Sequence, residues 1–315
     1  MTAPVPLTAP HRPGPAGAPH YLAGVDGGGT GTRVRLQDAA GRTLGQGEAG
    51  PSGLGQGVEQ AWRHVQQALL AAFQAAGLAP AVPAEVALGL GLAGAGVAAQ
   101  RAAFLQADPG FARCVLDNDG VTQLLGAFGG GPGIVLAAGT GSVAASRDEA
   151  GRVRQCGGWG FPVGDEGSGA WLGLRAMAHA HAVLDGRADA SALSAAVFKT
   201  AGADAPALLA WCAGAGARRY AELAPWVFAS ADGGCRTAQA LLQSAADALA
   251  AMVAALQPEG AAAPWPVVAS GSIGTRLARL WPPALQAHLV PAAGDSMDGA
   301  LQLLRAALAA DAHPA

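Results

Sequence analysis

The sequence predicts an α/β protein with mixed sheets, in which one structural unit occurs twice. The stretch Gly29-Thr30-Gly31-Thr32 recurs 110 positions later as Gly139-Thr140-Gly141-Ser142, and residues 38–42 match residues 148–152 at the same offset. Each copy follows an apolar run and leads into a short strand, an Ala-Gly-Arg turn and a returning segment. A strand, a Gly/Thr turn and a hairpin built twice indicate a duplicated phosphate-binding unit. Two loops of this kind point to phosphoryl transfer.

The hydrophobic pattern places a series of strands and helices after the first strand. The clearest is a helix over residues 57–76, where apolar side chains recur at spacings of three and four and Gly77 provides a stop. The predicted elements of the first half are strands at 21–25, 33–36 and 43–45, a helix at 57–76, a strand at 86–92, a helix at 100–107, a strand at 114–116 and a helix at 121–128.

The second copy begins at Gly133, and a long helical stretch over residues 170–255 follows its hairpin. The predicted elements there are helices at 170–184 and 238–256, a strand at 267–269 and helices at 275–280 and 297–309. Because a hairpin follows the first strand of each copy, the order differs from that of a doubly wound dinucleotide fold.

The composition excludes several classes of function. A net charge of −3 and a pI of about 6.1 give no basic surface for nucleic acid or an anionic membrane. No uninterrupted apolar run of about 18 residues occurs, so we expect no membrane-spanning helix. Residues 1–19 are rich in proline and alanine and lack the pattern of a signal peptide, which predicts a disordered tail. Four cysteines far apart favour reduced thiols in the cytoplasm over disulfides or a zinc site.

The first Gly/Thr loop, Asp26-Gly27-Gly28-Gly29-Thr30, is a candidate phosphate site. Its glycines let backbone amides approach phosphate oxygens, and Asp26 would hold Mg²⁺ directly or through water. A Gly-rich hairpin turn is the alternative, which the second copy makes less favoured. A Rossmann loop would need a helix next, and the chain has no Gly-Lys-Ser/Thr of a Walker A loop. Because Lys199 is the only lysine, Mg²⁺, backbone amides and Arg33 would neutralise the phosphates.

The segment Asp117-Asn118-Asp119 ends an apolar strand and precedes a helix. A carboxylate at this position can be held in a cleft and accept a proton from an attacking hydroxyl, which makes Asp119 a candidate general base. The alternative is that one of the three side chains only caps the helix.

The densest polar and glycine cluster of the second half is Gly157-Gly158-Trp159-Gly160 followed by Gly164-Asp165-Glu166-Gly167-Ser168. A tryptophan framed by glycines near two carboxylates suits a sugar, which needs an apolar platform and hydroxyl acceptors. The alternative is a structural turn with Trp159 in the core. Glu166 could also support the site from behind or form an ion pair.

The segment Ser270-Gly271-Ser272-Ile273 follows a strand and would let a helix N-terminus approach the ribose or adenine of a nucleotide. An ordinary strand-to-helix turn is an equal alternative. His179 and His181 lie in an alanine-rich helix without a spaced partner, so we do not expect metal ligation by them.

Taken together, these motifs resemble the N-acetylglucosamine kinase branch of the BadF/BadG/BcrA/BcrD ATPase family, within the actin, Hsp70 and hexokinase superfamily. The resemblance covers residues 20–305, and its most specific part is the block from Gly157 to Ser168. The matching motifs are Asp26–Thr30, Asn118-Asp119, Gly139–Ser142, Gly157–Gly160, Gly164–Ser168 and Gly271-Ser272.

The resemblance implies two ribonuclease-H-like, actin-like ATPase domains with ATP and a sugar in the cleft between them. The first domain would cover residues 20–128, and the second would cover residues 129–297 with a helical insertion. A closing helix at 298–311 would pack back on the first domain. The resemblance leaves the oligomeric state undecided, with a homodimer as one option.

The resemblance also assigns roles to residues, with Asp119 as the base that takes the proton of the sugar's 6-hydroxyl as it attacks the γ-phosphate. The phosphate- and ATP-binding set is Asp26, Gly28, Gly29, Thr30, Gly139, Thr140, Gly141, Ser142, Gly271 and Ser272. The sugar-binding set is Ser52, Asn118, Asp119, Thr140, Gly158, Trp159 and Asp165. ATP and Mg²⁺ are the implied cofactors, and an amino sugar is the implied small-molecule partner.

Departures from the family pattern leave open which amino sugar is the substrate. Related kinases often carry an asparagine in the loop after the first hairpin, where this chain has Ser52, a shorter substitute. Gly91 and Ala93 replace hydroxyl residues found in some relatives. The sequence therefore favours an N-acetylglucosamine kinase first and a glucosamine kinase second.

Two other classes of protein are weaker alternatives. An ATP-hydrolysing activator of a reductase or dehydratase would need closely placed cysteines for an iron–sulfur cluster, and the four cysteines here are scattered. A sugar-sensing regulator would need a DNA-binding segment, for which the N-terminal tail is too short and too rich in proline.

Overall fold

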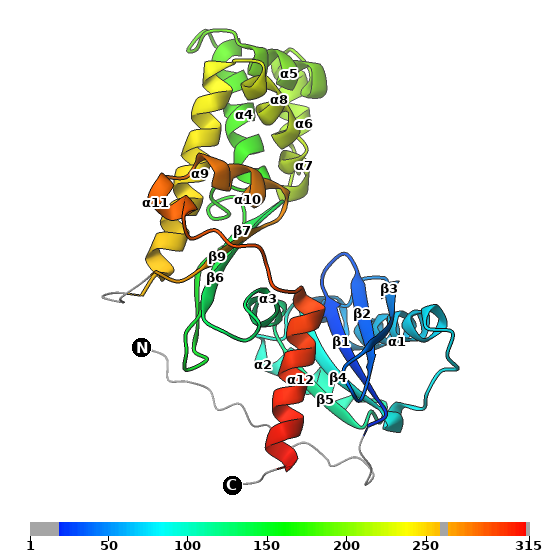
Figure 1. The fold of residues 1–315 in the computed structure, drawn as a ribbon. Coiled ribbons are helices and arrows are strands. Elements are labelled where there is room, and N and C mark those ends of the chain that lie inside the picture. The colour runs from blue at the N-terminus through cyan, green and yellow to red at the C-terminus, as the bar shows by residue number, and fades with distance from the viewer. Residues whose placement is uncertain (1–18, 259–263, 313–315) are drawn as a thin grey trace. The chain divides into compact units, whose positions relative to one another are not determined.

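The computed structural model describes residues 19–258 and 264–312 (Figure 1). The chain divides into two compact units, and each contains a sheet flanked by helices, which confirms the predicted α/β class. Unit 1 consists of the described residues up to Gly130 and those from Ala292 onward. Unit 2 is Gly131–Pro291.

Unit 1 is built on a five-stranded sheet in the order β3-β2-β1-β4-β5. Strands β1, β2 and β3 are antiparallel neighbours, whereas β4 runs parallel to β1 and to β5. The elements of unit 1 are β1 (Tyr21–Gly27), β2 (Thr32–Asp38), β3 (Thr43–Ala49), α1 (Val58–Ala75), β4 (Val86–Leu92), α2 (Ala98–Gln106), β5 (Arg113–Asp117), α3 (Asp119–Ala127) and α12 (Ser296–Ala312).

The two faces of this sheet pack against different helices, as the period-two alternation of a strand requires. On β1, Ala23 and Val25 belong to the core shared with α1, while Leu22 packs with Leu301 and Leu304 of α12. Glycine allows a close approach on the α12 face, because a Cβ built on Gly24 would lie 2.2 Å from the carbonyl oxygen of Met297. Helix α12 therefore closes unit 1 from the far end of the sequence (Figure 1).

Unit 2 is built on a four-stranded sheet in the order β8-β7-β6-β9, with β9 parallel to β6. Its strands are β6 (Gly133–Ala138), β7 (Ser142–Arg147), β8 (Val153–Gly157) and β9 (Val267–Ser270). Its helices are α4 (Gly169–Leu184), α5 (Ala192–Ala201), α6 (Ala205–Cys212), α7 (Ala217–Ala221), α8 (Ala224–Asp232), α9 (Arg236–Leu256), α10 (Ser272–Leu277) and α11 (Pro283–Gln286).

The predicted duplication is confirmed at the hairpin turns. The Asp38 carboxylate accepts the backbone N–H and the Nε of Arg42, and the Asp148 carboxylate does the same for Arg152. Gly41 has φ 86° and Gly151 has φ 80°, a left-handed conformation that glycine adopts without strain. The two copies thus fold alike down to the hydrogen bonds of the turn.

The helical stretch of unit 2 forms the larger part of that unit's core. Helix α9 is long and apolar enough to cross a membrane by length and composition alone. It buries Leu242, Leu249, Met252 and Val253 and contacts α8, β7 and β8, as a core helix does.

The return crossing from unit 2 to unit 1 lies between Pro291 and Ala292, earlier than the domain end at 297 expected from the sequence. The physical reason is that the segment before α12 is bonded to unit 1. The backbone N–H of Ala293 donates to the carbonyl of Ala127 at 2.9 Å, and Arg35 binds the Asp295 carboxylate at 2.8 Å.

Candidate active site

In unit 1, the first Gly/Thr loop forms the turn between β1 and β2. The backbone N–H of Gly28 donates to the carbonyl of Gly31 at 3.0 Å, which closes the turn, and Gly29 and Thr30 are exposed at its tip. The carbonyl of Gly28 accepts the N–H groups of Ser52 and Gly53. Backbone hydrogen bonds therefore fix the base of the loop, while its tip faces solvent.

Asp26 lies near the end of β1 and pairs with Arg33 directly across on β2. Its Oδ2 accepts Nη2 of Arg33 at 2.5 Å and Nε at 3.2 Å. The hydrogen bond that Arg33 donates to this carboxylate is the largest cause that raises the pKa of Arg33. Sequence reasoning named both residues but did not detect the pair, which the antiparallel register creates.

Asp119 is the first residue of α3, directly after β5. The cap of this helix is Asn118, whose side chain accepts the N–H of Val121 at 3.2 Å, so Asp119 is not needed as the cap. Burial raises the pKa of Asp119, and the charge of Asp26 raises it further, against the opposing hydrogen bond from the N–H of Gly120. Unit 1 thus brings Asp26 and Asp119 within electrostatic reach of each other.

Ser52 requires a correction to the expected sugar contacts. Its side chain is completely buried, and its hydroxyl accepts a hydrogen bond from Thr32 Oγ1 at 2.7 Å. A Cβ built on Gly27 would lie 2.0 Å from Ser52 Oγ, so the hydroxyl is packed against the β1 backbone. Direct contact of this hydroxyl with a sugar is not compatible with that packing.

Packing inside unit 1 explains why position 91 is a glycine, which the sequence did not reveal. A Cβ built on this residue would lie 2.0 Å from Oγ1 of Thr122 in α3. The absent side chain therefore leaves room for Thr122, and Gly91 is not an empty sugar-contact position.

In unit 2, hydrogen bonds join the Gly139–Ser142 loop to the segment that leads from Glu166 into α4. The carbonyls of Gly139 and Thr140 accept the N–H groups of Gly169 and Ala170, the first two residues of α4. Ser142 is buried, and its hydroxyl donates to the carbonyl of Glu166 at 2.7 Å. Because the Ser142 hydroxyl is bonded within the protein, the hydroxyl of the loop that is exposed to a ligand is that of Thr140.

Asp165 occupies a strained backbone position beside this loop. Its φ is +58°, and it is the single non-glycine residue with positive φ among the described residues. One carboxylate oxygen accepts the backbone N–H of Ser142 at 3.3 Å. Its neighbour Glu166 has a buried Oε2 without a hydrogen-bond partner in the described part of the chain. Strain of this kind gathers at functional sites.

Trp159 is 85% exposed, which excludes the alternative of a core tryptophan. Gly157, Gly158 and Gly160 around it all have positive φ, between 73° and 83°. The N–H of Gly158 donates to the carbonyl of Ser142 at 3.1 Å, which ties this loop to the Gly139–Ser142 turn. An exposed indole on a loop that is bonded to the site can serve as a platform for a ligand.

Gly271 and Ser272 lie where β9 turns into α10, which begins three residues before the predicted helix. Gly271 has φ 77°, and a Cβ there would lie 2.3 Å from the carbonyl oxygen of Ala138. The turn is therefore packed against the residue that precedes the Gly139–Ser142 loop, and Ser272 is exposed beside it.

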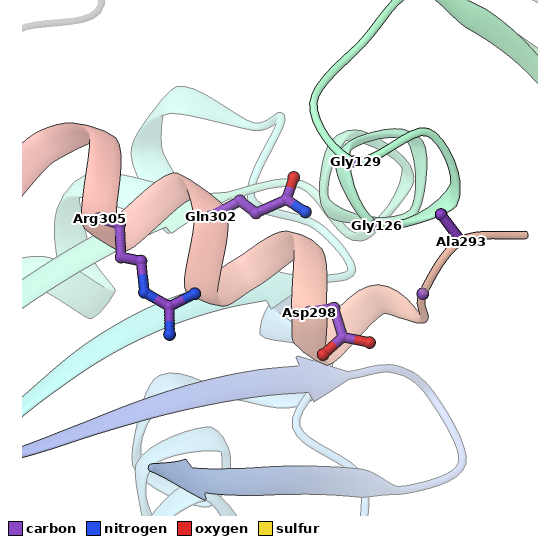
Figure 2. A pocket seen from close by; sticks show the side chains of 7 residues that line it. Gly126, Gly129, Ala293, Asp298, Gln302 and Arg305 are labelled. Carbon is purple, nitrogen blue, oxygen red and sulfur yellow. The ribbon is translucent and has the colours of Figure 1, made fainter. Parts of the chain in front are cut away.

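A hollow of about 320 Å³ lies in unit 1 between the end of α3 and the first turns of α12 (Figure 2). Asp298, Gln302 and Arg305 line one side, as Figure 2 shows, with Gly126, Gly129, Ala293 and Gly294 around the rest. Asp298 is already paired with Arg35, and Arg305 already donates a hydrogen bond to the amide oxygen of Gln37. We assign no ligand to this hollow.

Similar proteins identify the family of this chain. Residues 23–284 match the profile of the BadF/BadG/BcrA/BcrD ATPase family. The chain belongs to this family. The glucosamine kinase GspK of Vibrio cholerae is 33% identical over 282 residues, which cover 90% of this chain and 95% of that kinase. An N-acetylmuramic acid/N-acetylglucosamine kinase of Clostridium acetobutylicum is 28% identical over 177 residues, 55% of this chain and 57% of the relative.

Solved structures agree with this assignment to the BadF/BadG/BcrA/BcrD family. A candidate N-acetylglucosamine kinase of Chromobacterium violaceum superimposes with a TM-score of 0.82 at 44% identity, covering 91% of this chain and 99% of that one. A second candidate N-acetylglucosamine kinase, from Porphyromonas gingivalis, has a TM-score of 0.61 at 18% identity and shows the shared fold alone. The fold is thus the two-domain, ribonuclease-H-like fold expected from the sequence.

Proposed function

We propose that this protein is an ATP-dependent kinase that transfers the γ-phosphoryl group of ATP to the 6-hydroxyl of an amino sugar. Membership of an ATPase family supports the use of ATP, and the sugar kinases among the similar proteins support a sugar as the acceptor. N-acetylglucosamine is our first choice, and glucosamine, the substrate named for the Vibrio relative, is the alternative.

The observation that carries the proposal is the half-buried carboxylate of Asp119, the first residue of α3. Its raised pKa makes it a stronger base than an ordinary aspartate. In the proposed step, Asp119 takes the proton of the 6-hydroxyl as that oxygen forms its bond to the γ-phosphorus. The bond from the γ-phosphorus to the bridging oxygen breaks, and ADP leaves with the electron pair.

The remaining roles are distributed over both units. Gly28, Gly29, Thr30, Gly139, Thr140 and Gly141 would bind the phosphates through amides and hydroxyls, and Gly271 with Ser272 would lie beside the adenosine. Ser142 would support its loop instead of touching ATP, because its hydroxyl and its N–H are already bonded. Asn118, Thr140, Gly158, Trp159 and Asp165 would contact the sugar.

A magnesium ion fits the carboxylate of Asp26. Arg33 engages Oδ2 of Asp26, which leaves Oδ1 for the ion or for one of its waters. The described residues contain no group of three or more His, Cys, Asp or Glu side chains that could hold a metal by themselves. Magnesium, when bound with ATP, would neutralise negative charge on the phosphates. Lysine contributes little to this task, because the chain contains a single lysine. A cytoplasmic location and a homodimer belong to the same proposal.

The replacement Asp119→Asn tests the proposal, because it keeps the shape of the side chain and removes the base. We expect sugar-dependent turnover to fall by about a thousandfold, within the range of general-base removal, while nucleotide binding stays near the wild-type level. Asp117→Asn is the matched control, since Asp117 stands two residues earlier and its carboxylate accepts the backbone N–H of Asn118 at 2.8 Å. Near-normal turnover by Asp119→Asn would reject Asp119 as the base.

A further inference from the structure

Thr122 is completely buried in the first turns of α3 and lies one turn after Asp119. Its hydroxyl donates to the backbone carbonyl of Asp119 at 3.1 Å. Because Asp119 opens the helix, its carbonyl belongs to the turn whose geometry sets the direction of the carboxylate. The hydroxyl of Thr122 therefore ties down the backbone that carries Asp119.

Two glycines from distant parts of the chain hold Thr122 in place. A Cβ built on Gly91 of β4 would lie 2.0 Å from Oγ1 of Thr122, and one on Gly299 of α12 would lie 1.8 Å from its carbonyl oxygen. Distances this short mean that neither glycine can gain a side chain without a shift of α3 or its neighbour. Thr122 is thus confined from the sheet on one side and from the closing helix on another.

We propose that Thr122 is a positioning residue for Asp119, and that α12 contributes to this role by confining Thr122 through Gly299. The proposal rests on the function proposed above, in which Asp119 is the base. Helix α12 thereby acts on a carboxylate 180 positions before Gly299 (299 − 119), without touching substrate itself.

The replacement Thr122→Val separates the hydroxyl from the packing, because valine keeps the branched shape and cannot donate a hydrogen bond. Thr122→Ser keeps the hydroxyl and removes one methyl group. We expect Thr122→Val to lower kcat roughly ten- to hundredfold, the scale on which misplacement of a catalytic group by about 1 Å acts, with the KM for ATP unchanged. Thr122→Ser should restore most of the rate.

The acid limb of the pH–rate profile distinguishes positioning from a general loss of structure. If the first turn loosens, the Asp119 carboxyl gains access to water, and its pKa falls toward the ordinary aspartate value. The limb of Thr122→Val should then move to lower pH, while that of Thr122→Ser should match the wild type. Rates are normalised to the folded fraction measured by nucleotide binding.

Thr200→Val is the matched control, because Thr200 also donates its hydroxyl to a helix carbonyl, that of Ala196 at 3.0 Å, but is exposed on α5. Its kcat and acid limb should equal those of the wild type. Wild-type values for Thr122→Val, or equal losses in Thr122→Val and Thr122→Ser, would overturn the positioning role. Absence of sugar-dependent turnover in the wild-type protein would instead reject the proposed function, and near-normal turnover in Asp119→Asn would reject Asp119 as the base.

Discussion

Asp26 and Asp119 are close enough in unit 1 for the negative charge of Asp26 to raise the pKa of Asp119. Burial is the larger cause, and the charge of Asp26 adds to it. A group with a raised pKa binds its proton at higher pH, so the general base should lose activity at a pH above the ordinary aspartate value. The acid limb of kcat/KM should therefore lie above pH 3.8, the reference value for this side chain.

The replacement Asp26→Asn should move that acid limb to lower pH, because it removes a like charge that favours the protonated form of Asp119. The expected result is read from kcat/KM for the sugar between about pH 4 and 8, whatever the loss in rate at neutral pH. Glu59→Gln serves as the control, since Glu59 is a surface carboxylate of unit 1 with a side chain that is 95% exposed. A limb that stays in place or moves to higher pH would contradict the coupling.

Replacement of Trp159 should weaken sugar binding without changing the stability of the fold. Because the indole is exposed, Trp159→Ala should leave the melting temperature unchanged. Loss of a stacking surface worth about 1.4 kcal/mol would raise the KM for the sugar roughly tenfold. Steady-state kinetics and a thermal melt measure the two effects on the same sample.

Trp62 is the contrasting tryptophan, since it is buried and stacks on Phe104 with ring centroids 4.2 Å apart. Trp62→Ala should lower the free energy of unfolding by about 3–5 kcal/mol. A Trp159→Ala protein that melts early with an unchanged KM would show that Trp159 is structural.

At the scale of elements, Arg35 of β2 anchors the segment that leads into α12. Its guanidinium binds the carboxylates of Asp295 and Asp298, and its side chain is only 14% exposed. Burial acts to raise the pKa of Asp298, but the hydrogen bond from Arg35 and that from the N–H of Asp295 outweigh it, so the pKa is lowered. The anchor therefore favours the ionised carboxylate.

The replacement Arg35→Met should lower the free energy of unfolding at pH 7 by about 1–3 kcal/mol, between the values for exposed and buried ion pairs. A lowered pKa gives stability that is present above the unfolded value of 3.8 and is lost as pH falls through the folded value. The difference between wild type and Arg35→Met, measured by urea unfolding, should thus shrink below about pH 4.

Arg63→Met is the control for this anchor, because Arg63 pairs with Glu59 at 3.6 Å on the surface of α1. It should change stability by less than about 0.5 kcal/mol. An Arg35→Met effect no larger than this, or one that grows in acid, would contradict the anchor.

At the scale of the whole molecule, local pattern predicted most elements because each is encoded by a short stretch. The helix over 57–76 became α1 at Val58–Ala75, and the buried strand at 86–92 became β4 unchanged. The 110-residue repeat predicted two like hairpins, and both form with the same turn bonds. These features depend on neighbours in sequence, which a sequence displays.

What the sequence could not predict depends on contacts between distant segments. Ser52 looked like a sugar contact until the fold placed its hydroxyl against Thr32 and the backbone of β1. Gly91 looked like a missing contact, whereas it makes room for Thr122. The predicted roles of the site residues themselves remain proposals, which the experiments above address.

ADP release from Mg-ATP in the presence of single sugars measures the proposed kinase activity directly. The set should contain N-acetylglucosamine, glucosamine, N-acetylmuramic acid and glucose, with product mass and position of the phosphate determined for each active sugar. We expect strong stimulation by an amino sugar, a 6-phosphorylated product and no stimulation in Asp119→Asn. ATP hydrolysis at the same rate with every sugar and with none would contradict it.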